Sequence, residues 1–343
     1  MNRYKELFVK VVDLKGDAYS IGVKQGREIR DSHLSNQLEQ LREMAVDVNS
    51  ETAKFSLKRF SPTLLNELEG IAESVEMDPD EAVRLYSGFN LAFPSMGCTA
   101  FVQNGYYVRN YDFSPELYDA RLVFTQPQDG YSSVGFSQQV IGRLDGMNEK
   151  GLVVGLHFVN SDHRSEGFMA TTIVRMLLDN CANVEEATSL IKSIPHGYCY
   201  NYSMADSSGR AVLVEASPEQ VFVKVKNPLI CTNHFGSAEL MGMNRDVIES
   251  SKKRMLHVSS LLNKDMTAFS AYEHFNDTDS PLFYQDYKNY FGTLHTVVYS
   301  PNDLSLLIGI GGNCEPIPLS LKEYLKGEAE FPDFLSGMIL NED

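Results

Sequence analysis

The chain of 343 residues contains no tryptophan, and its few cysteines are Cys98, Cys181, Cys199, Cys231 and Cys314. An odd number of cysteines without a C-x-x-C pair is a poor basis for a disulfide framework or a zinc site. No window approaches the roughly 18 apolar residues of a membrane span. The opening stretch MNRYKELFVKVVDLKG carries charges too closely spaced for a signal peptide. We therefore expect a cytoplasmic protein, outside the membrane, that uses no metal and no organic cofactor.

Positive charge is also scarce, because 30 Lys and Arg residues face 46 Asp and Glu residues, which gives a net charge of −16 and a pI of about 4.9. Such an acidic surface argues against nucleic acid or an anionic membrane as a partner. Hydrophobic residues make up 43% of the chain, enough for one large core or two modest ones. No linker and no internal repeat interrupts the sequence, so we expect a single structural domain. The sequence does not indicate whether the protein is a monomer or a homo-oligomer.

The first 97 residues are expected to form a helical segment. Ser61-Pro62 and Asp78-Pro79 are typical helix starts, and the second helix is predicted to run to about Phe93. The stretch 18–48 predicts one long helix with an apolar side formed by Ile29, Leu34, Leu38, Leu41 and Val48.

The pattern changes at residue 98, where strand-like runs separated by Asn-Gly and Asp-Gly turns begin. Predicted helices follow at 167–180, 184–194, 247–262 and 267–275, and predicted strands at 200–205, 211–216, 220–225 and 229–232. The stretch TLHTVVYSPNDLSLLIGIG predicts a closing hairpin. Two helical groups that flank many antiparallel strands imply an α+β protein with four layers, helix, sheet, sheet and helix (αββα).

The pair Gly97-Cys98 opens the first of these strands and permits a specific chemistry. A thiol can attack the carbonyl carbon of the residue before it, and glycine lets the backbone bend as this attack requires. Hydrolysis of the resulting thioester leaves Cys98 as a new N-terminus. Its thiol is then a nucleophile, and its α-amine, with a pKa of about 7.7–8.0, is a suitable base. Taken alone, Cys98 is also compatible with a small buried apolar residue.

A hairpin folded on Asn104-Gly105 places residues whose numbers sum to about 209 opposite each other. Gly97 and Cys98 then lie near Tyr111 and Asp112. Asp112 would accept a hydrogen bond from the new amine, and Arg109 would supply a positive field that favours the thiolate. An ordinary surface ion pair is the alternative interpretation of Arg109 and Asp112.

The block GCTAF…VRNYDF resembles the N-terminal-nucleophile hydrolases that act on linear amides, which comprise the acyl-CoA:6-aminopenicillanic acid acyltransferases and the choloylglycine hydrolases. The latter include penicillin V acylases and bile salt hydrolases. This resemblance implies a self-processing precursor of αββα fold that cleaves a non-peptide amide or transfers its acyl group. The long segment before Cys98 is more similar to the acyltransferase branch. Residues 1–97 are then a cleaved leader that stays bound, and residues 98–343 are the catalytic segment.

Two further blocks are similar to the same family. DGMNEKGLVVGLHF places the family's oxyanion-assisting asparagine on His157, which is a departure, and CTNHF places the oxyanion asparagine on Asn233. The family has an arginine further along the chain, which the resemblance places on Arg254 or, alternatively, on Arg245. Without the resemblance, Asn233 is compatible with a turn residue, His157 with a core histidine and Arg254 with a solvated helix residue.

The resulting hypothesis is a cysteine amidase that hydrolyses a small N-acylated molecule through an acyl-Cys98 intermediate. Tyr111 and Phe113 are expected to contribute to an apolar pocket for the acyl group. Acyl transfer from CoA or an amide to an amine is one alternative. A homologue that binds an acylated ligand without turnover is the other, and the change to His157 favours it. Activation would produce pieces of 97 and 246 residues.

Overall fold

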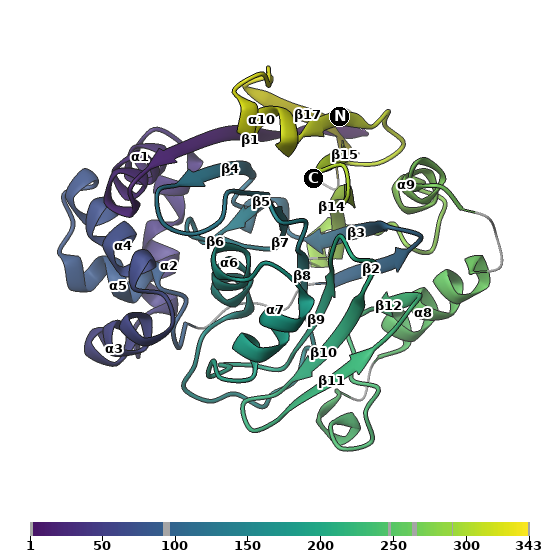
Figure 1. Ribbon diagram of the computed structural model, residues 1–343, viewed down its shortest axis with the longest axis horizontal. Coiled ribbons are helices and arrows are strands. Elements are labelled where there is room, and N and C mark those ends of the chain that lie inside the picture. The colour runs from purple at the N-terminus through teal and green to yellow at the C-terminus, as the bar shows by residue number, and fades with distance from the viewer. Residues whose placement is uncertain (1–2, 92–96, 246–247, 263–265, 290, 342–343) are drawn as a thin grey trace.

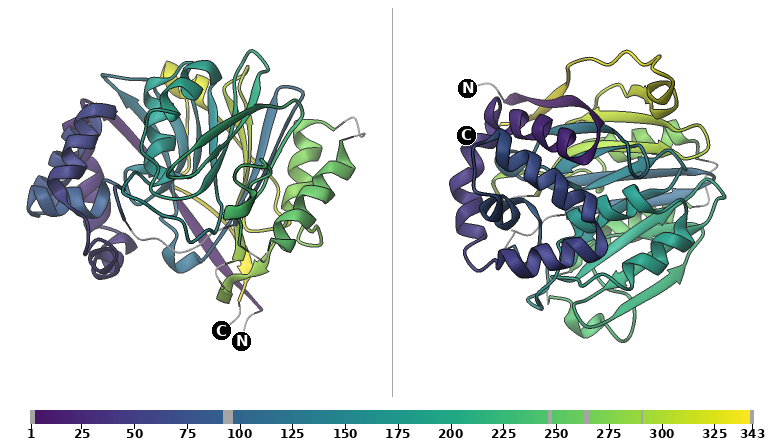
Figure 2. Two further views of the ribbon diagram at one scale, coloured as in Figure 1. Left: turned by 90° about the horizontal axis from the view of Figure 1, so that it is seen from below. Right: turned by 60° about the vertical axis from the view of Figure 1, so that its left-hand side comes forward.

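The computed structural model describes residues 3–91, 97–245, 248–262, 266–289 and 291–341, and these residues build two stacked sheets with helices outside both (Figures 1 and 2). The larger sheet has the strand order β11-β10-β9-β8-β7-β5-β4-β1-β17, with β6 paired to β5. The smaller sheet has the order β12-β2-β3-β14-β15-β16, with β13 paired to β14. All the strand pairs of the described residues are antiparallel except β1 with β4. The predicted αββα fold is confirmed.

The strands of the larger sheet are β1 (Tyr4–Gly16), β4 (Arg121–Pro127), β5 (Ser133–Gln138), β6 (Gly142–Arg143), β7 (Asp145–Asn148), β8 (Val153–Phe158), β9 (Tyr200–Ala205), β10 (Ala211–Ala216), β11 (Val221–Val225) and β17 (Phe334–Leu340). Those of the smaller sheet are β2 (Gly97–Gln103), β3 (Tyr106–Phe113), β12 (Leu229–Cys231), β13 (Gln285–Asp286), β14 (Phe291–Ser300), β15 (Ser305–Ile310) and β16 (Ile317–Ser320).

The helices fall into groups by position in the chain. The first group is α1 (Ala18–Arg30), α2 (Leu38–Met44), α3 (Ser50–Phe60), α4 (Pro62–Ser74) and α5 (Pro79–Tyr86). The others are α6 (Ala170–Asn180) and α7 (Val184–Ile191) on the larger sheet, α8 (Glu249–Leu261) and α9 (Ala268–Asn276) on the smaller sheet, and α10 (Leu321–Lys326). Short 3₁₀ helices cover His33–Gln37, Pro115–Leu117, Met241–Met243 and Tyr287–Asn289. No helix in the described ranges has the length and apolar character that a membrane crossing requires.

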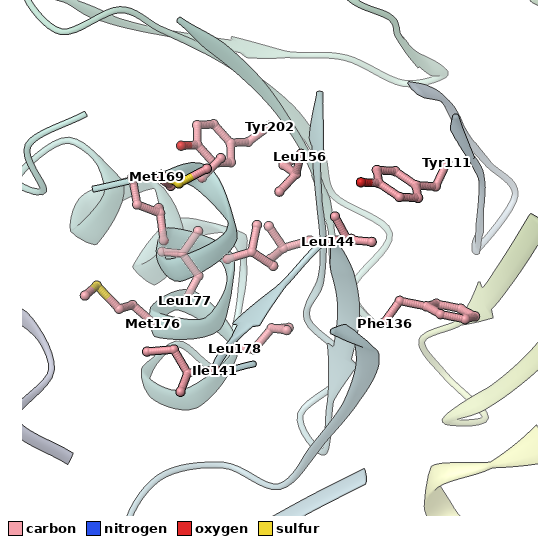
Figure 3. Packing of buried hydrophobic residues seen from close by; sticks show 14 of the residues in the cluster. Tyr111, Phe136, Ile141, Leu144, Leu156, Met169, Met176, Leu177, Leu178 and Tyr202 are labelled. Carbon is pink, nitrogen blue, oxygen red and sulfur yellow. The ribbon is translucent and has the colours of Figure 1, made fainter. Parts of the chain in front are cut away.

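The hydrophobic core lies on both faces of the larger sheet (Figure 3). On one face Leu177 and Leu178 of α6 pack towards Leu156 of β8. On the other face Phe136 of β5 lies between the two sheets and stacks on the ring of His295 from β14, with 3.6 Å between ring centroids. Tyr111 of β3 also packs in this layer. Side chains that meet between the sheets are thus fixed by close packing from both sides.

The elements predicted after residue 97 agree with the structure within a few residues. Helix α7 begins after Asn183, whose side chain accepts from the backbone N–H groups of Glu185 and Glu186, and ends at Ile191. Strands β14 and β15 form the predicted closing hairpin. Strand β17 and helix α10 were not predicted.

The prediction of an entirely helical leader is wrong. Residues Tyr4–Gly16 form strand β1, because both of its edges pair with other strands, β17 and β4, and because Leu7, Val9, Val12 and Leu14 are buried. The single helix predicted over 18–48 is broken after Arg30, where Ser32 caps a 3₁₀ turn through the backbone N–H of Leu34. Helix α5 ends at Tyr86, and Phe93 lies outside the described residues.

Helices α1 and α4 approach each other backbone to backbone. A Cβ atom added to Gly22 would lie 1.9 Å from the carbonyl oxygen of Glu67, and one added to Gly70 would lie 2.2 Å from that of Tyr19. Glycine is therefore the residue that fits at both positions. This contact sets the position of α4 and directs Glu67 towards the interior.

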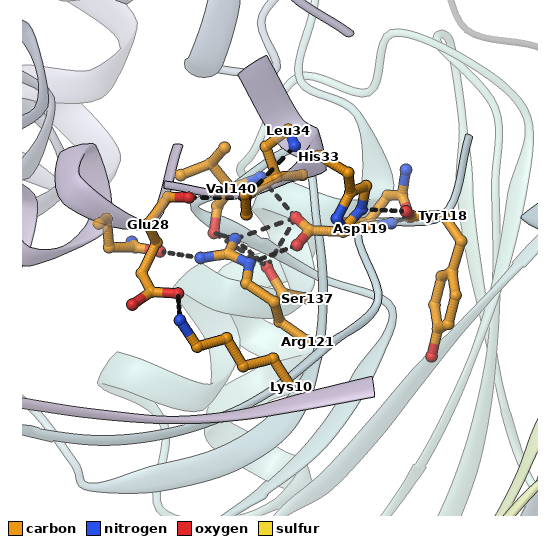
Figure 4. A network of polar contacts seen from close by, with 12 residues as sticks. Lys10, Glu28, His33, Leu34, Tyr118, Asp119, Arg121, Ser137 and Val140 are labelled. Atoms are coloured by element: carbon orange, nitrogen blue, oxygen red, sulfur yellow. Dashed lines mark hydrogen bonds and ion pairs between the residues drawn. The ribbon is translucent and has the colours of Figure 1, made fainter. Parts of the chain in front are cut away.

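A buried network of charges connects the leader to the rest of the chain. Arg175 of α6 donates to Glu67 of α4 at 2.9 Å and to Asp179 at 2.8 Å. Glu67 also accepts from Gln25 of α1, and Gln25 in turn accepts from Arg121 of β4 at 3.2 Å. Figure 4 shows the continuation of the network, in which Arg121 pairs with Asp119 and contacts Ser137 and the carbonyl oxygen of Val140.

Replacing Glu67 with alanine is expected to lower the free energy of unfolding by about 3 kcal/mol, because Arg175 then keeps only Asp179 as a buried anionic partner. Chemical denaturation in a Cys98→Ala background measures this on a single uncut chain. The matched control is Glu69→Ala, at an exposed position of the same helix, which should shift stability by less than about 0.5 kcal/mol. Equal stability of the two variants would contradict the role given to Glu67.

Candidate active site

The β2–β3 hairpin brings the two ends of the predicted cysteine block together. Gly97 pairs with Asp112 and Cys98 pairs with Tyr111, so the predicted register is confirmed. The turn has a φ of 50° at Asn104 and 81° at Gly105. Two consecutive positive φ angles are typical of a type I′ turn, whose twist matches that of the flanking strands.

The side chains of this hairpin alternate between the two faces of the smaller sheet. Arg109 points to the larger sheet, where it contacts Asp145 and the carbonyl oxygen of Leu156. Asp112 points to the opposite face, where it accepts from Thr293 and lies 3.8 Å from Arg254 of α8. The thiol of Cys98 is on the Arg109 face, while Asp112 lies beside the backbone of the neighbouring Gly97.

The thiol of Cys98 accepts a hydrogen bond from Nη2 of Arg109 at 3.0 Å. The residue is fully buried, and burial raises the pKa of the thiol to about 12 although the charge of Arg109 acts in the opposite direction. At neutral pH the thiol of this uncut chain is therefore protonated and a poor nucleophile.

Arg109 is held by Asp145, a residue that sequence reasoning read only as part of a turn with Gly146. Nη1 of Arg109 donates to Oδ2 of Asp145 at 2.5 Å, and the hydroxyl of Tyr299 donates to Oδ1 at 2.5 Å. Burial acts to raise the pKa of Asp145, but Arg109 and His295 outweigh it and hold this pKa below its usual value. No spacing in the sequence connects Asp145 with Arg109, so no sequence signal indicated this contact.

The backbone of Cys98 is held on both sides by the residues carried over from the family. Its N–H donates to Oδ1 of Asn233 at 2.8 Å, and its carbonyl oxygen accepts from Nη1 of Arg254 at 2.5 Å. Arg254 also donates to Oδ1 of Asn233 at 2.9 Å. Nδ2 of Asn233 donates to the carbonyl oxygen of Phe158 at 2.8 Å, so an oxyanion would have to compete for this donor.

Arg254, and not its rival Arg245, reaches Cys98. Arg254 lies in α8 and is fully buried against the small sheet. Arg245 forms an ion pair with Asp162 near the surface.

The two carboxylate oxygens of Asp112 differ in their hydrogen bonding within the described residues. Oδ1 accepts from the hydroxyl of Thr293 at 2.7 Å, whereas Oδ2 has no hydrogen-bond partner among the described residues. A Cβ atom added to Gly97 would lie 3.1 Å from Oδ2. Burial raises the pKa of Asp112, with Arg254 acting in the opposite direction. This oxygen is thus a ready acceptor for an N–H group formed next to Gly97.

His157, which the resemblance places at an asparagine position of the family, is fully buried in β8. Its Nε2 lies 2.8 Å from the hydroxyl of Ser203, and its Nδ1 has no hydrogen-bond partner among the described residues. Burial, reinforced by the charge of Arg109, lowers the pKa of His157 well below its usual value. The ring is therefore neutral near pH 7 and adds no charge to the site.

Replacing His157 with asparagine is expected to reduce the loss of stability at acid pH. A histidine with a lowered pKa in the folded state stabilises the fold above pH 6.5 and loses this contribution as pH falls towards its folded pKa. Below pH 6.5 the stability of the wild type should fall relative to the variant by up to about 1.4 kcal/mol per pH unit. Denaturation curves between pH 5 and 7.5 measure the difference, and parallel curves would contradict a neutral His157.

Tyr111 and Phe113 are both fully buried in the layer between the sheets, where Tyr111 stacks on His295. Their role in an acyl pocket stays a prediction.

The cavities beside the site are lined by other residues. One of about 50 Å³ touches Asn233, Arg254 and Phe291, and it adjoins a cavity of about 1000 Å³.

Comparison with known proteins gives a family match and several distant structural similarities. The family model "Acyl-coenzyme A:6-aminopenicillanic acid acyl-transferase" matches residues 101–314. A penicillin V acylase from Agrobacterium tumefaciens is 14% identical over 66% of this chain and 86% of its own, with a TM-score of 0.44. A conjugated bile acid hydrolase from Clostridium perfringens is also 14% identical, over 66% and 93%, with a TM-score of 0.43.

An N-acylethanolamine-hydrolyzing acid amidase ortholog from Caenorhabditis elegans is 15% identical over 60% of this chain and 93% of its own, with a TM-score of 0.40. No curated protein matches the sequence. The family match covers more than half of the chain and includes Arg109, Asp112, His157, Asn233 and Arg254. The protein therefore belongs to the acyl-coenzyme A:6-aminopenicillanic acid acyl-transferase family, within the N-terminal-nucleophile hydrolases.

Proposed function

We propose that this protein is a self-processing cysteine amidase that hydrolyses a linear amide of a small N-acylated molecule. The main observation in support of the proposal is the set of polar contacts around Cys98. Arg109 contacts the thiol of Cys98, while Asn233 and Arg254 hold its N–H and its carbonyl oxygen. A buried structural cysteine needs no such set of polar partners.

The processing step is an attack of the Cys98 sulfur on the carbonyl carbon of Gly97. The bond between that carbon and the nitrogen of Cys98 breaks, the nitrogen takes up the thiol proton, and a thioester remains. Water then hydrolyses the thioester to the carboxylate of Gly97 and the free thiol. Glycine suits position 97, because an added Cβ atom would lie 2.8 Å from the ring of Phe291.

The cut creates an α-amine where Asn233 now accepts an N–H and where Oδ2 of Asp112 lies close by. In turnover this amine takes the thiol proton as sulfur attacks the amide carbonyl of the substrate. The departing amine receives the proton, and water releases the acyl group from Cys98. A side-chain amide aimed at the oxyanion, the role proposed for Asn233, is worth about 3–4 kcal/mol in comparable enzymes.

The leader is proposed to remain part of one structural domain after the cut. Strand β1 is hydrogen-bonded on both edges, to β17 and to β4, which belong to the segment 98–343. The buried contact of Glu67 with Arg175 adds a second attachment. We also place the protein in the cytoplasm, acting on a small molecule rather than on nucleic acid or a membrane.

Acyl transfer is the second candidate, favoured by the family to which the chain belongs. An acceptor amine would replace water in the second half of the reaction. Hydrolysis is preferred because water needs no binding site of its own. The inert alternative rests on His157 in place of asparagine.

A panel of N-acylated amines with varied acyl groups, given to cut protein, tests the proposal. The release of free amine, together with a mass increase on the 98–343 piece equal to the acyl group, is the expected result. Addition of a second amine distinguishes transfer from hydrolysis through the new amide it would form. A cut protein that forms no acyl adduct and releases no amine from any member would support the inert alternative.

A further inference from the structure

The two adjoining cavities beside Cys98 share a small set of lining residues. Asn160, Arg245, Ser250 and Phe291 line both the cavity of about 50 Å³ and the cavity of about 1000 Å³. The smaller one also touches Asn233 and is therefore next to the backbone of Cys98. Asn160 therefore lines the space that reaches Asn233, whose Oδ1 accepts the N–H of Cys98, while the thiol itself contacts Arg109.

Asn160 carries an unsatisfied acceptor at this junction. Its Oδ1 is buried and has no hydrogen-bond partner within the described parts of the chain. The residue follows strand β8 closely, and the carbonyl oxygen of Phe158, two residues earlier, accepts from Asn233. Asn160 is thus attached to the same backbone segment that orients the proposed oxyanion residue. A buried acceptor without a protein donor is unfavourable unless a ligand or a water molecule in the adjoining cavity supplies the donor, and a substrate that displaces such a water must then supply a donor itself.

A secondary amide presents one acceptor and one donor at its reacting centre. Its carbonyl oxygen takes hydrogen bonds from the groups that stabilise the oxyanion, so its N–H needs an acceptor. We propose that Asn160 is a specificity-determining residue whose Oδ1 accepts the N–H of the scissile amide, which selects secondary amides over esters and N-alkylated amides. This inference rests on the proposed amidase function. A site built to hydrogen-bond an N–H rejects an analogue that lacks it, because its own polar group is left unpaired.

Three substrates with the same acyl group and the same leaving-group skeleton test the inference: a secondary amide, its N-methyl form and the corresponding ester. Asn160→Ala should lower kcat/KM for the secondary amide at least tenfold and change that for the ester less than threefold. Asn160→Asp keeps an acceptor and should retain most of the preference. Asn302→Ala, at an exposed turn position, is the matched control and should behave as the wild type.

The outcomes separate this inference from the function on which it depends. An Asn160→Ala variant that folds and keeps the wild-type ratio of amide to ester turnover would overturn the inference. An equal loss on all three substrates would also overturn it, because the residue would then be structural. Cut wild-type protein that is inactive on every amide and ester of the broader panel would instead overturn the amidase function, and the inference with it.

Discussion

Replacing Cys98 with alanine is expected to leave one uncut chain of 343 residues without detectable amide hydrolysis, whereas the wild type yields pieces of 97 and 246 residues. The physical reason is that one atom, the sulfur, is the nucleophile in both reactions. Its removal leaves Arg109, Asn233 and Arg254 in place but gives them no group to activate. Mass spectrometry of the intact protein and an amine-release assay measure the two losses.

Cys98→Ser and Cys314→Ala are the controls for this experiment. Serine keeps a weaker nucleophile at the same position and should cut far more slowly than cysteine. Cys314 is partly exposed and contacts Tyr272 and Asn276, so its replacement should change neither cutting nor turnover. A Cys98→Ala chain that still appears as two pieces would assign the cut to a contaminating protease.

Replacing Asp145 with leucine is expected to produce the second large effect, a loss of about 3–5 kcal/mol in the free energy of unfolding. Arg109 and Asp145 are both fully buried, and Arg109 would keep its charge without its carboxylate partner. Denaturation in the Cys98→Ala background measures the loss. Asp129→Leu, at an exposed position, is the control.

A double variant separates the contribution of this pair to stability from its contribution to chemistry. Combining Asp145→Leu with Arg109→Met removes both buried charges, which should restore much of the lost stability. The same double variant with Cys98 intact should remain uncut, because no cation then contacts the thiol. A double variant that is stable and cuts at the wild-type rate would show that Arg109 has no chemical role.

The elements after residue 97 were predictable because their signals are local. The Asn104-Gly105 turn fixes the register of β2 and β3 through two positive φ angles, and Asn183 marks the start of α7 through its side-chain cap. Strand β1 was missed because its partners are distant in the sequence. Its parallel pairing with β4 joins Lys10 to Arg121, and the adjacent apolar residues at 7–9 and 11–12 interrupt the alternation of apolar and charged residues that would indicate a strand.

The contacts of the site likewise fall into local ones, which the sequence predicts, and contacts between distant residues, which it does not. The approach of Asp112 to Gly97 followed from the hairpin register alone. The contacts of Asn233 and Arg254 with Cys98 join residues far apart in the chain, so only the resemblance to a family indicated them. Asp145 was missed because its partner Arg109 lies in the other sheet, and no spacing in the sequence shows which side chains meet between two sheets.

N-terminal sequencing of the folded, substrate-consuming protein tests the central claim most directly. The account predicts two sequences, one from the start of the chain and one that begins Cys98-Thr99-Ala100. Active protein that gives the first sequence only would contradict it, because no α-amine would then share residue 98 with the thiol.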